Sequence, residues 1–295
     1  MRQGITRWTI YLLCLCIVGP AAGALTGALR ASDGSHAASP LFCTSPGIGL
    51  AAGLGALGLA LVMGLLAAKL VNVAAGFTAA GLVMAWAAWQ TGDVDDMIRT
   101  AQSGGPLLSQ AAEGVLFGAL GILLAAGLFA WGRAEQAADR PQGPVHADLA
   151  VAQKVAQTFA SVLIRIFKGK GGMAVLPVAV IAGAAAGWFI GVNPHKGQAV
   201  FAAIAAGVLG GAAGRLVDFE VSLPSLMLPI VALAVLGPLT GFAFAGGGGA
   251  QVVHAAYKGT LFPLANITAL DWIAGALLGI PMGVAWAGSM MEKKA

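Results

Sequence analysis

The chain is a succession of long apolar stretches separated by short polar ones. Most of the apolar stretches have the roughly 17–25 residues that a helix needs to cross the hydrocarbon core of a membrane. The pattern therefore predicts an all-α, polytopic transmembrane protein with about eight membrane-spanning helices. The expected spans are 8–29, 47–68, 70–90, 114–132, 173–191, 198–214, 225–245 and 271–290.

Two of these spans follow each other almost without a break. Lys69 and Asn72 interrupt the apolar stretch between residues 47 and 90. This stretch is too long for one crossing, so we expect a tight helical hairpin with Lys69 at its turn.

The N-terminus is open to two interpretations. A basic start, an apolar core and the triplet Ala22-Gly23-Ala24 together resemble a secretory signal peptide with its cleavage site. The glycine spacing of this segment recurs in a later span, which favours a helix that is retained in the protein.

Composition excludes an ordinary soluble domain. The chain is 58% hydrophobic and 9% charged, whereas about 25% of the residues of a soluble domain are charged. The mean hydropathy is +0.85. Three cysteines without a CxxC pair predict neither a disulfide framework nor a cysteine-based metal site.

The distribution of basic residues predicts the orientation. Loops on the cytoplasmic side of a membrane carry an excess of Lys and Arg. With eight spans and a cytoplasmic N-terminus, 12 of the 16 basic residues are cytoplasmic, and only Arg30, Arg99, Lys196 and Lys258 are outside. We therefore expect both termini in the cytoplasm, in a membrane such as the bacterial inner membrane.

The longest cytoplasmic segment, 134–172, is expected to be a linker that contains an amphipathic helix. Apolar residues recur there at helical spacing, and Arg165, Lys168 and Lys170 follow near its end. Such a helix can lie in the membrane interface, or it can pack on the cytoplasmic side of its own protein. The apolar positions are Leu149, Ala152, Ala156, Phe159, Leu163 and Ile166.

Four short matches in the same order suggest that the chain is duplicated. Residues 19–27 resemble 183–191, and 69–73 resemble 215–219. Further on, 97–107 resemble 252–264, and 113–122 resemble 271–280. We expect two four-helix units, residues 1–133 and 173–295, in the same orientation, related by an axis along the membrane normal.

Three spans contain glycine at every fourth position. Such a stripe lets another helix approach closely in lipid. We expect these positions to be helix-packing faces, without knowing whether the partner belongs to the same chain. They are Gly19, Gly23 and Gly27; Gly183, Gly187 and Gly191; and Gly275, Gly279 and Gly283.

Ionisable residues near the membrane are few, and they are the candidates for function. Lys69 with Asn72, and Arg215 with Asp218 and Glu220, lie at corresponding cytoplasmic turns. These residues can form solvated turns with local ion pairs, a cytoplasmic gate or ion-entry site, or a docking surface.

Glu113 and Asp271 open the fourth and eighth spans from the outside. An acid at this position complements the positive end of its helix. The alternative is a pseudo-symmetric pair that guards a cation path. The outside loops before these two spans are expected to form short surface helices or, as the alternative, re-entrant segments.

The sequence lacks recognisable enzyme motifs. The four histidines are widely separated, and neither HExxH nor GxSxG occurs. We therefore predict no enzymatic activity, no cofactor, no metal and no nucleic-acid partner. Two functions remain: a non-catalytic subunit that packs against other membrane subunits or its own copies in the lipid bilayer, or a channel or transporter for a small solute or cation with its path between the repeats.

Overall fold

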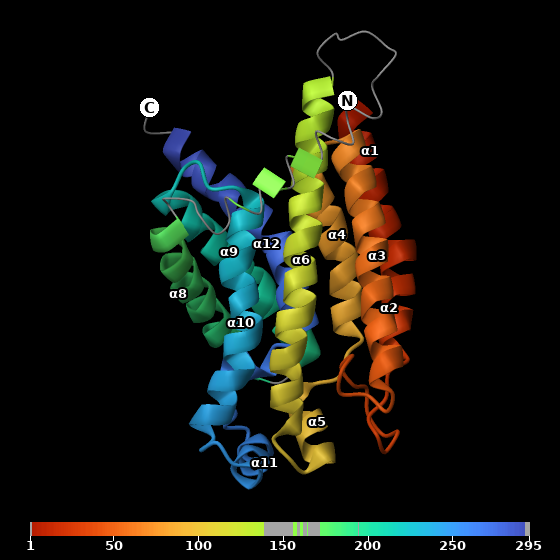
Figure 1. The fold of residues 1–295 in the computed structure, drawn as a ribbon, viewed down its shortest axis with the longest axis vertical. Coiled ribbons are helices and arrows are strands. Elements are labelled where there is room, and N and C mark those ends of the chain that lie inside the picture. The colour runs from red at the N-terminus through yellow and green to blue at the C-terminus, as the bar shows by residue number, and fades with distance from the viewer. Residues whose placement is uncertain are drawn as a thin grey trace.

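The computed structural model describes residues 2–138, 172–193 and 195–292, with a few isolated positions between 156 and 164. This part of the chain is built from helices (Figure 1). Seven helices are long and apolar enough to cross a membrane, and Ala174–Ile190 forms a slightly shorter apolar helix. The chain is thus an all-α integral membrane protein, as predicted. The elements are α1 (Arg2–Leu13), η1 (Cys14–Val18), α2 (Gly19–Gly27), α3 (Pro46–Leu70), α4 (Val73–Trp89), α5 (Val94–Ala101), α6 (Gly105–Ala138), α8 (Gly172–Ile190), α9 (Lys196–Val217), α10 (Leu223–Phe244), α11 (Gly249–Lys258), η2 (Pro263–Asn266) and α12 (Ala269–Glu292).

The first span is one continuous helical segment that contains a π-helical turn. Pro20 follows this turn, η1, and has no backbone N–H to donate to the preceding turn. A π turn places an extra residue in the helix and accommodates such a missing hydrogen bond. The span therefore remains helical from α1 through η1 to α2.

The two ends of the bundle differ. The start of α1 and the last turns of α12 lie at the same end, at the top of Figure 1, while α5 and α11 lie at the opposite end. A chain that starts and finishes at the same end crosses an even number of times. The predicted hairpin is confirmed, because α3 ends at Leu70 and α4 begins at Val73.

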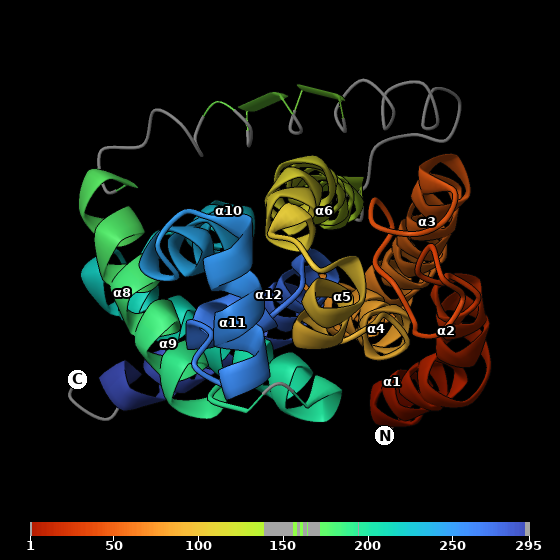
Figure 2. The same ribbon diagram turned by 90° about the horizontal axis from the view of Figure 1, so that it is seen from below.

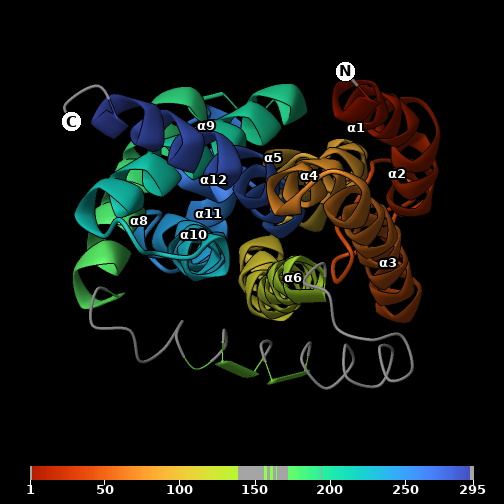
Figure 3. The same cartoon turned by 90° about the horizontal axis from the view of Figure 1, so that it is seen from above.

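The helices form two groups with α6 and α12 between them. Viewed from either end, α1 to α4 lie on one side and α8 to α10 on the other (Figures 2 and 3). The groups are connected mainly where α6 packs along α10 and α12 packs along α4, and α12 also contacts α6. At one end, α5 also contacts α11.

Large apolar side chains close the contact between the two groups by packing onto glycines. Leu278 of α12 lies against Gly81 of α4, and Ile273 lies against Gly121 of α6. Val231 of α10 packs in the same way against Gly118. The result is one continuous apolar core that includes buried residues of both groups.

All three predicted glycine stripes pack inside the chain, and each contacts its own half. The stripe of α2 lies against Trp86 and Gln90 of α4. The stripe of α8 lies against α9, α10 and the segment from 263 to 272. The stripe of α12 lies directly against the backbone of α9. The structure thus answers a question that the sequence left open, namely where each partner helix comes from.

Two boundaries differ from the prediction or lie outside the described residues. The fourth span was predicted over 114–132, but α6 begins at Gly105 and continues to Ala138. The rest of the predicted linker 134–172, including its amphipathic helix, falls almost entirely outside the residues that the structure describes. The two loops that were predicted to lie outside contain the short helices α5 and α11, which lie beyond the ends of the long helices (Figure 1).

Candidate functional site

Asp271 is the centre of a buried polar cluster at the end that carries α5 and α11. It lies in the first turn of α12 and its side chain is fully buried. The backbone N–H and the hydroxyl of Thr268 donate to Oδ2 at 2.8 and 2.7 Å. The N–H of Asp271 in turn donates to Thr268 Oγ1 at 3.4 Å, so the two residues form a capping box at the start of α12.

Lys196 completes this cluster from α9. Its Nζ lies 2.7 Å from Asp271 Oδ2 and 3.2 Å from Thr268 Oγ1, and 11% of its side chain is exposed. A buried charge is tolerated when an opposite charge and hydrogen bonds compensate for lost hydration. Sequence reasoning did not select Lys196, although a lone basic residue in a short loop that is predicted to lie outside runs against the positive-inside rule and is a usable signal.

Glu113 does not open its helix as predicted, because α6 begins at Gly105 and Glu113 lies about two turns inside it. Its side chain is fully buried. The backbone N–H of Leu41 donates to Oε1 at 2.6 Å, while Oε2 has no partner among the described residues. Glu113 thus fastens the loop between α2 and α3 to α6.

Gln110 links the acid-bearing helices of the two halves. It lies one turn before Glu113 on α6, and its Oε1 accepts a hydrogen bond from the backbone N–H of Ala269 at 3.3 Å. Its Nε2 has no partner among the described residues. Glu113 binds the loop that precedes α3, Asp271 binds Lys196 at the first position of α9, and Gln110 connects α6 with the start of α12.

Arg99 joins the two surface helices. It forms ion pairs with Asp95 at 2.9 Å and Asp96 at 3.6 Å within α5. It also donates to the carbonyl of Ala256 in α11 at 2.9 Å, and its guanidinium lies 5.6 Å from the ring centre of Tyr257. Beneath these polar contacts, both helices bury an apolar cluster of their own. The sequence indicated the surface helices but not their mutual contact.

The residues selected at the opposite end are separate from this cluster. Asn72 caps α4, since its Oδ1 accepts from the N–H of Ala75 at 2.8 Å. Lys69 is exposed in the last turn of α3. Asp218 Oδ1 accepts from the N–H of Glu220 at 2.9 Å. No ion pair involves Lys69, Arg215, Asp218 or Glu220 within the described part of the chain, where the ion pairs are those of Arg99 and Lys196.

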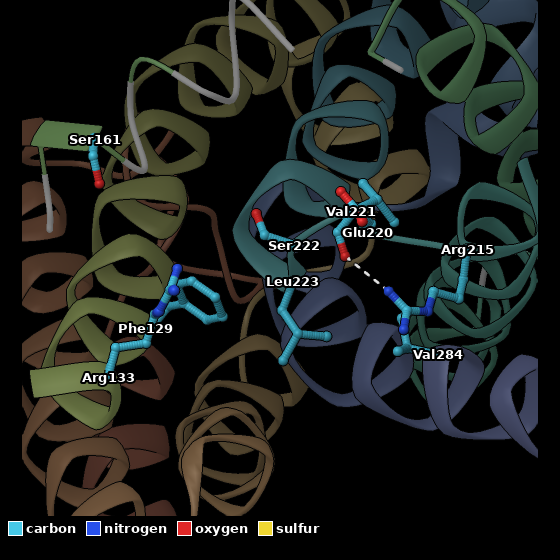
Figure 4. Close-up of a pocket in the computed structure, with 9 residues that line it drawn as sticks. All are labelled: Phe129, Arg133, Ser161, Arg215, Glu220, Val221, Ser222, Leu223 and Val284. Atoms are coloured by element: carbon cyan, nitrogen blue, oxygen red, sulfur yellow. Dashed lines mark hydrogen bonds between the residues drawn. The ribbon is translucent and has the colours of Figure 1, made fainter. Parts of the chain in front are cut away.

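A pocket of about 250 Å³ lies beside Arg215 (Figure 4). It brings together α6, α9, α12 and the turn before α10, so residues of both halves form its wall. Arg215 donates to the carbonyl of Val221 at 3.5 Å, and its buried Nε has no partner among the described residues. The lining residues are Phe129, Arg133, Ser161, Arg215, Glu220, Val221, Ser222, Leu223 and Val284.

Comparison with protein families, with curated proteins and with solved structures finds no match. The described residues also contain no group of three or more His, Cys, Asp or Glu side chains arranged to hold a metal ion. The polar clusters and the surfaces of the helices are therefore the basis for inferring function.

Proposed function

We propose that the chain is a non-catalytic subunit of a larger membrane assembly. The observation that carries this proposal is an exposed face of α3 that combines small residues with a large apolar one. Gly47, Ala51 and Gly58 lie on this face together with Leu54, which is 44% exposed. A Cβ atom added at Gly47 or Gly58 would meet nothing within 4 Å among the described residues.

Small residues on a lipid-facing helix permit the close approach of another helix. The three predicted glycine stripes of this chain are covered by helices of the same chain. The exposed face of α3 combines Gly47, Ala51 and Gly58 with the larger Leu54, and α3 lies at the outer edge of the bundle (Figures 2 and 3). A helix of another subunit would bury this face as α9 buries the stripe of α12.

The packed interior supports the same function. The contact between the halves is filled by side chains such as Leu278 and Ile273, and Trp272 and Phe117 are fully buried within their own halves, against Gly187 and Gly53. This arrangement favours a rigid structural unit over a path for a solute between the halves. It also supports a role in which the chain acts through its surface.

A duplicated plan is the second part of the proposal. The contact of α6 with α10 pairs the fourth helix of one half with the third helix of the other, and the contact of α12 with α4 is its counterpart. The contact between α5 and α11 joins equivalent elements. Contacts of this kind are what a two-fold axis along the membrane normal would produce.

Three buried polar side chains favour a second candidate function, a cation path. Glu113 Oε2, Asp271 Oδ1 and Gln110 Nε2 are buried and have no partner among the described residues. Ionisable groups at membrane depth often mark the pathways of ions. Cation flux into vesicles that contain this chain alone, abolished by Glu113→Gln, would favour the path over the subunit.

The proposed orientation places both termini in the cytoplasm of a bacterial cell. A reporter enzyme that works only in the cytoplasm should then be active when it is fused at Gly143 or at the C-terminus, because both positions follow an even number of crossings. A reporter enzyme that works only in the periplasm should be active when it is fused near Gly247, between α10 and α11. Reversal of any one of these three results would contradict the eight-helix topology.

The proposed function is tested by the mass of the particle that the chain forms in mild detergent. We expect a particle that contains other membrane polypeptides, or further copies of the chain, in fixed proportion. Gly58→Leu should release the chain from this particle, because the leucine would keep a neighbouring helix away from α3. The chain itself should stay folded, because nothing lies within 4 Å of an added Cβ atom at Gly58 among the described residues. Gly127→Leu is the matched control, since Gly127 is also free of neighbours within 4 Å among the described residues. A particle of one chain that is identical for all three proteins would refute the proposal.

A further inference from the structure

The pocket at Arg215 contains two guanidinium groups from different halves of the molecule. Arg133 comes from α6 and Arg215 from α9, and both line the cavity of about 250 Å³. Figure 4 shows them on opposite sides of the turn that leads into α10. The pocket lies at the end of the bundle that carries the termini, where a span meets the headgroups of the bilayer.

Few donors of either arginine have a partner among the described residues. Arg215 makes one hydrogen bond at 3.5 Å, the limit of such an interaction, and its Nε is buried without a partner among the described residues. The guanidinium of Arg133 lies 5.6 Å from the ring centre of Phe129. In the part of the chain that the structure describes, no carboxylate lies within 4 Å of either guanidinium.

The start of α10 lies beside the arginines and is also positively polarised. Ser222 is the N-cap of α10 and Leu223 its first residue, and both line the pocket. The helix dipole gives this N-terminus a partial positive charge, although Pro224 has no N–H and Ser222 Oγ already accepts a hydrogen bond from the N–H of Ser225. Phe129, Val221 and Leu223 supply an apolar wall next to these positive groups.

We propose that this pocket binds a phosphate group, carried either by a phospholipid headgroup or by a small soluble phosphoester. The planar guanidinium group presents paired donors that match the oxygens of phosphate. Basic pockets between membrane helices on the cytoplasmic side are suited to lipid headgroups. Glu220 lines the same pocket, and its carboxylate would favour a headgroup that also carries an ammonium group.

The test uses the full chain, purified and stripped of lipid in detergent. Phosphatidylethanolamine and phosphatidylglycerol are added, and retained lipid is counted by native mass spectrometry. In parallel, phosphoethanolamine and inorganic phosphate are added and the thermal midpoint is measured. We expect Arg133→Gln and Arg215→Gln each to weaken phosphate-dependent binding about tenfold or more, since hydrogen bonds to charged groups are lost. Arg7→Gln, which changes an exposed arginine in α1, should bind as the unaltered chain does.

The two arms identify the source of the phosphate. Retention of lipid without an effect of the soluble compounds assigns the site to a headgroup, and the converse assigns it to a soluble phosphoester. Glu220→Gln should remove the preference for the ethanolamine-bearing compound and leave phosphate binding intact. If Arg133→Gln and Arg215→Gln both bind like Arg7→Gln, or if the unaltered chain binds none of the four compounds, the proposal is overturned. Arg133 is exposed, so its variant should fold even if Arg215→Gln does not.

Discussion

Replacing Gly279 by alanine should lower the thermal midpoint of unfolding and the yield of folded protein. A Cβ atom at this position would lie 2.7 Å from the backbone N of Val208 and 2.8 Å from the carbonyl carbon of Gly207. Both atoms belong to the backbone of α9, so relief requires that α9 and α12 move apart. Overpacking of this kind costs about 1–3 kcal/mol.

Gly288→Ala is the matched control for this prediction. Gly288 lies on the same helix, but nothing lies within 4 Å of an added Cβ atom among the described residues. Alanine forms helices more readily than glycine by up to about 1 kcal/mol, so this variant should be as stable as the unaltered chain or more stable. Both substitutions change helix propensity equally, so the difference between them measures the packing of α12 on α9. Equal midpoints for the two variants would show that this contact is not close.

Replacing either Lys196 or Asp271 by an uncharged residue should lower the free energy of unfolding more than replacing any other charged residue. Removal of one partner leaves the other as an uncompensated buried charge, at a cost of about 3–5 kcal/mol. We therefore expect Lys196→Met and Asp271→Asn each to lower the free energy of unfolding by this amount. Together the two substitutions should cost clearly less than the sum of the single effects, because neither charge is then left alone.

Lys258→Met provides the control for the loss of a lysine on the same side of the molecule. Lys258 is exposed in the last turn of α11, and exchange of such a residue changes stability by about 0.5 kcal/mol or less. Denaturant titration of the four variants in one detergent gives the required free energies. Strictly additive effects of Lys196→Met and Asp271→Asn would contradict the ion pair.

The number and approximate positions of the helices could be predicted from hydropathy, whereas their exact ends could not. The hairpin at Lys69 follows from the length of an apolar stretch, and the structure confirms it. The start of α6 at Gly105 was missed, because residues 105–113 contain Gly, Pro, Ser and Gln and do not read as an apolar span. These residues are helical where Leu107 packs with α5 and α11, a contact that no local pattern describes.

The polar cluster illustrates the same limit. Asp271 and Glu113 could be selected because acids near a membrane span are rare. Lys196 is 75 residues from Asp271 in the chain, and nothing near Lys196 in the sequence indicates this partner. The glycine stripes likewise show that a helix approaches but not which helix it is. The sequence therefore indicated which surfaces and charged residues have partners, but only the structure shows which residues pair with each other.

The most direct measurement of the proposed subunit role is photo-crosslinking in intact membranes from position 58. A photoreactive side chain in place of Gly58 on α3 should yield a discrete adduct with another polypeptide, or with a second copy of the chain. The same group in place of Ile181 of α8, a residue that is 68% exposed, should react with lipid alone. Reaction with lipid alone at both positions would contradict the proposal that another subunit covers α3.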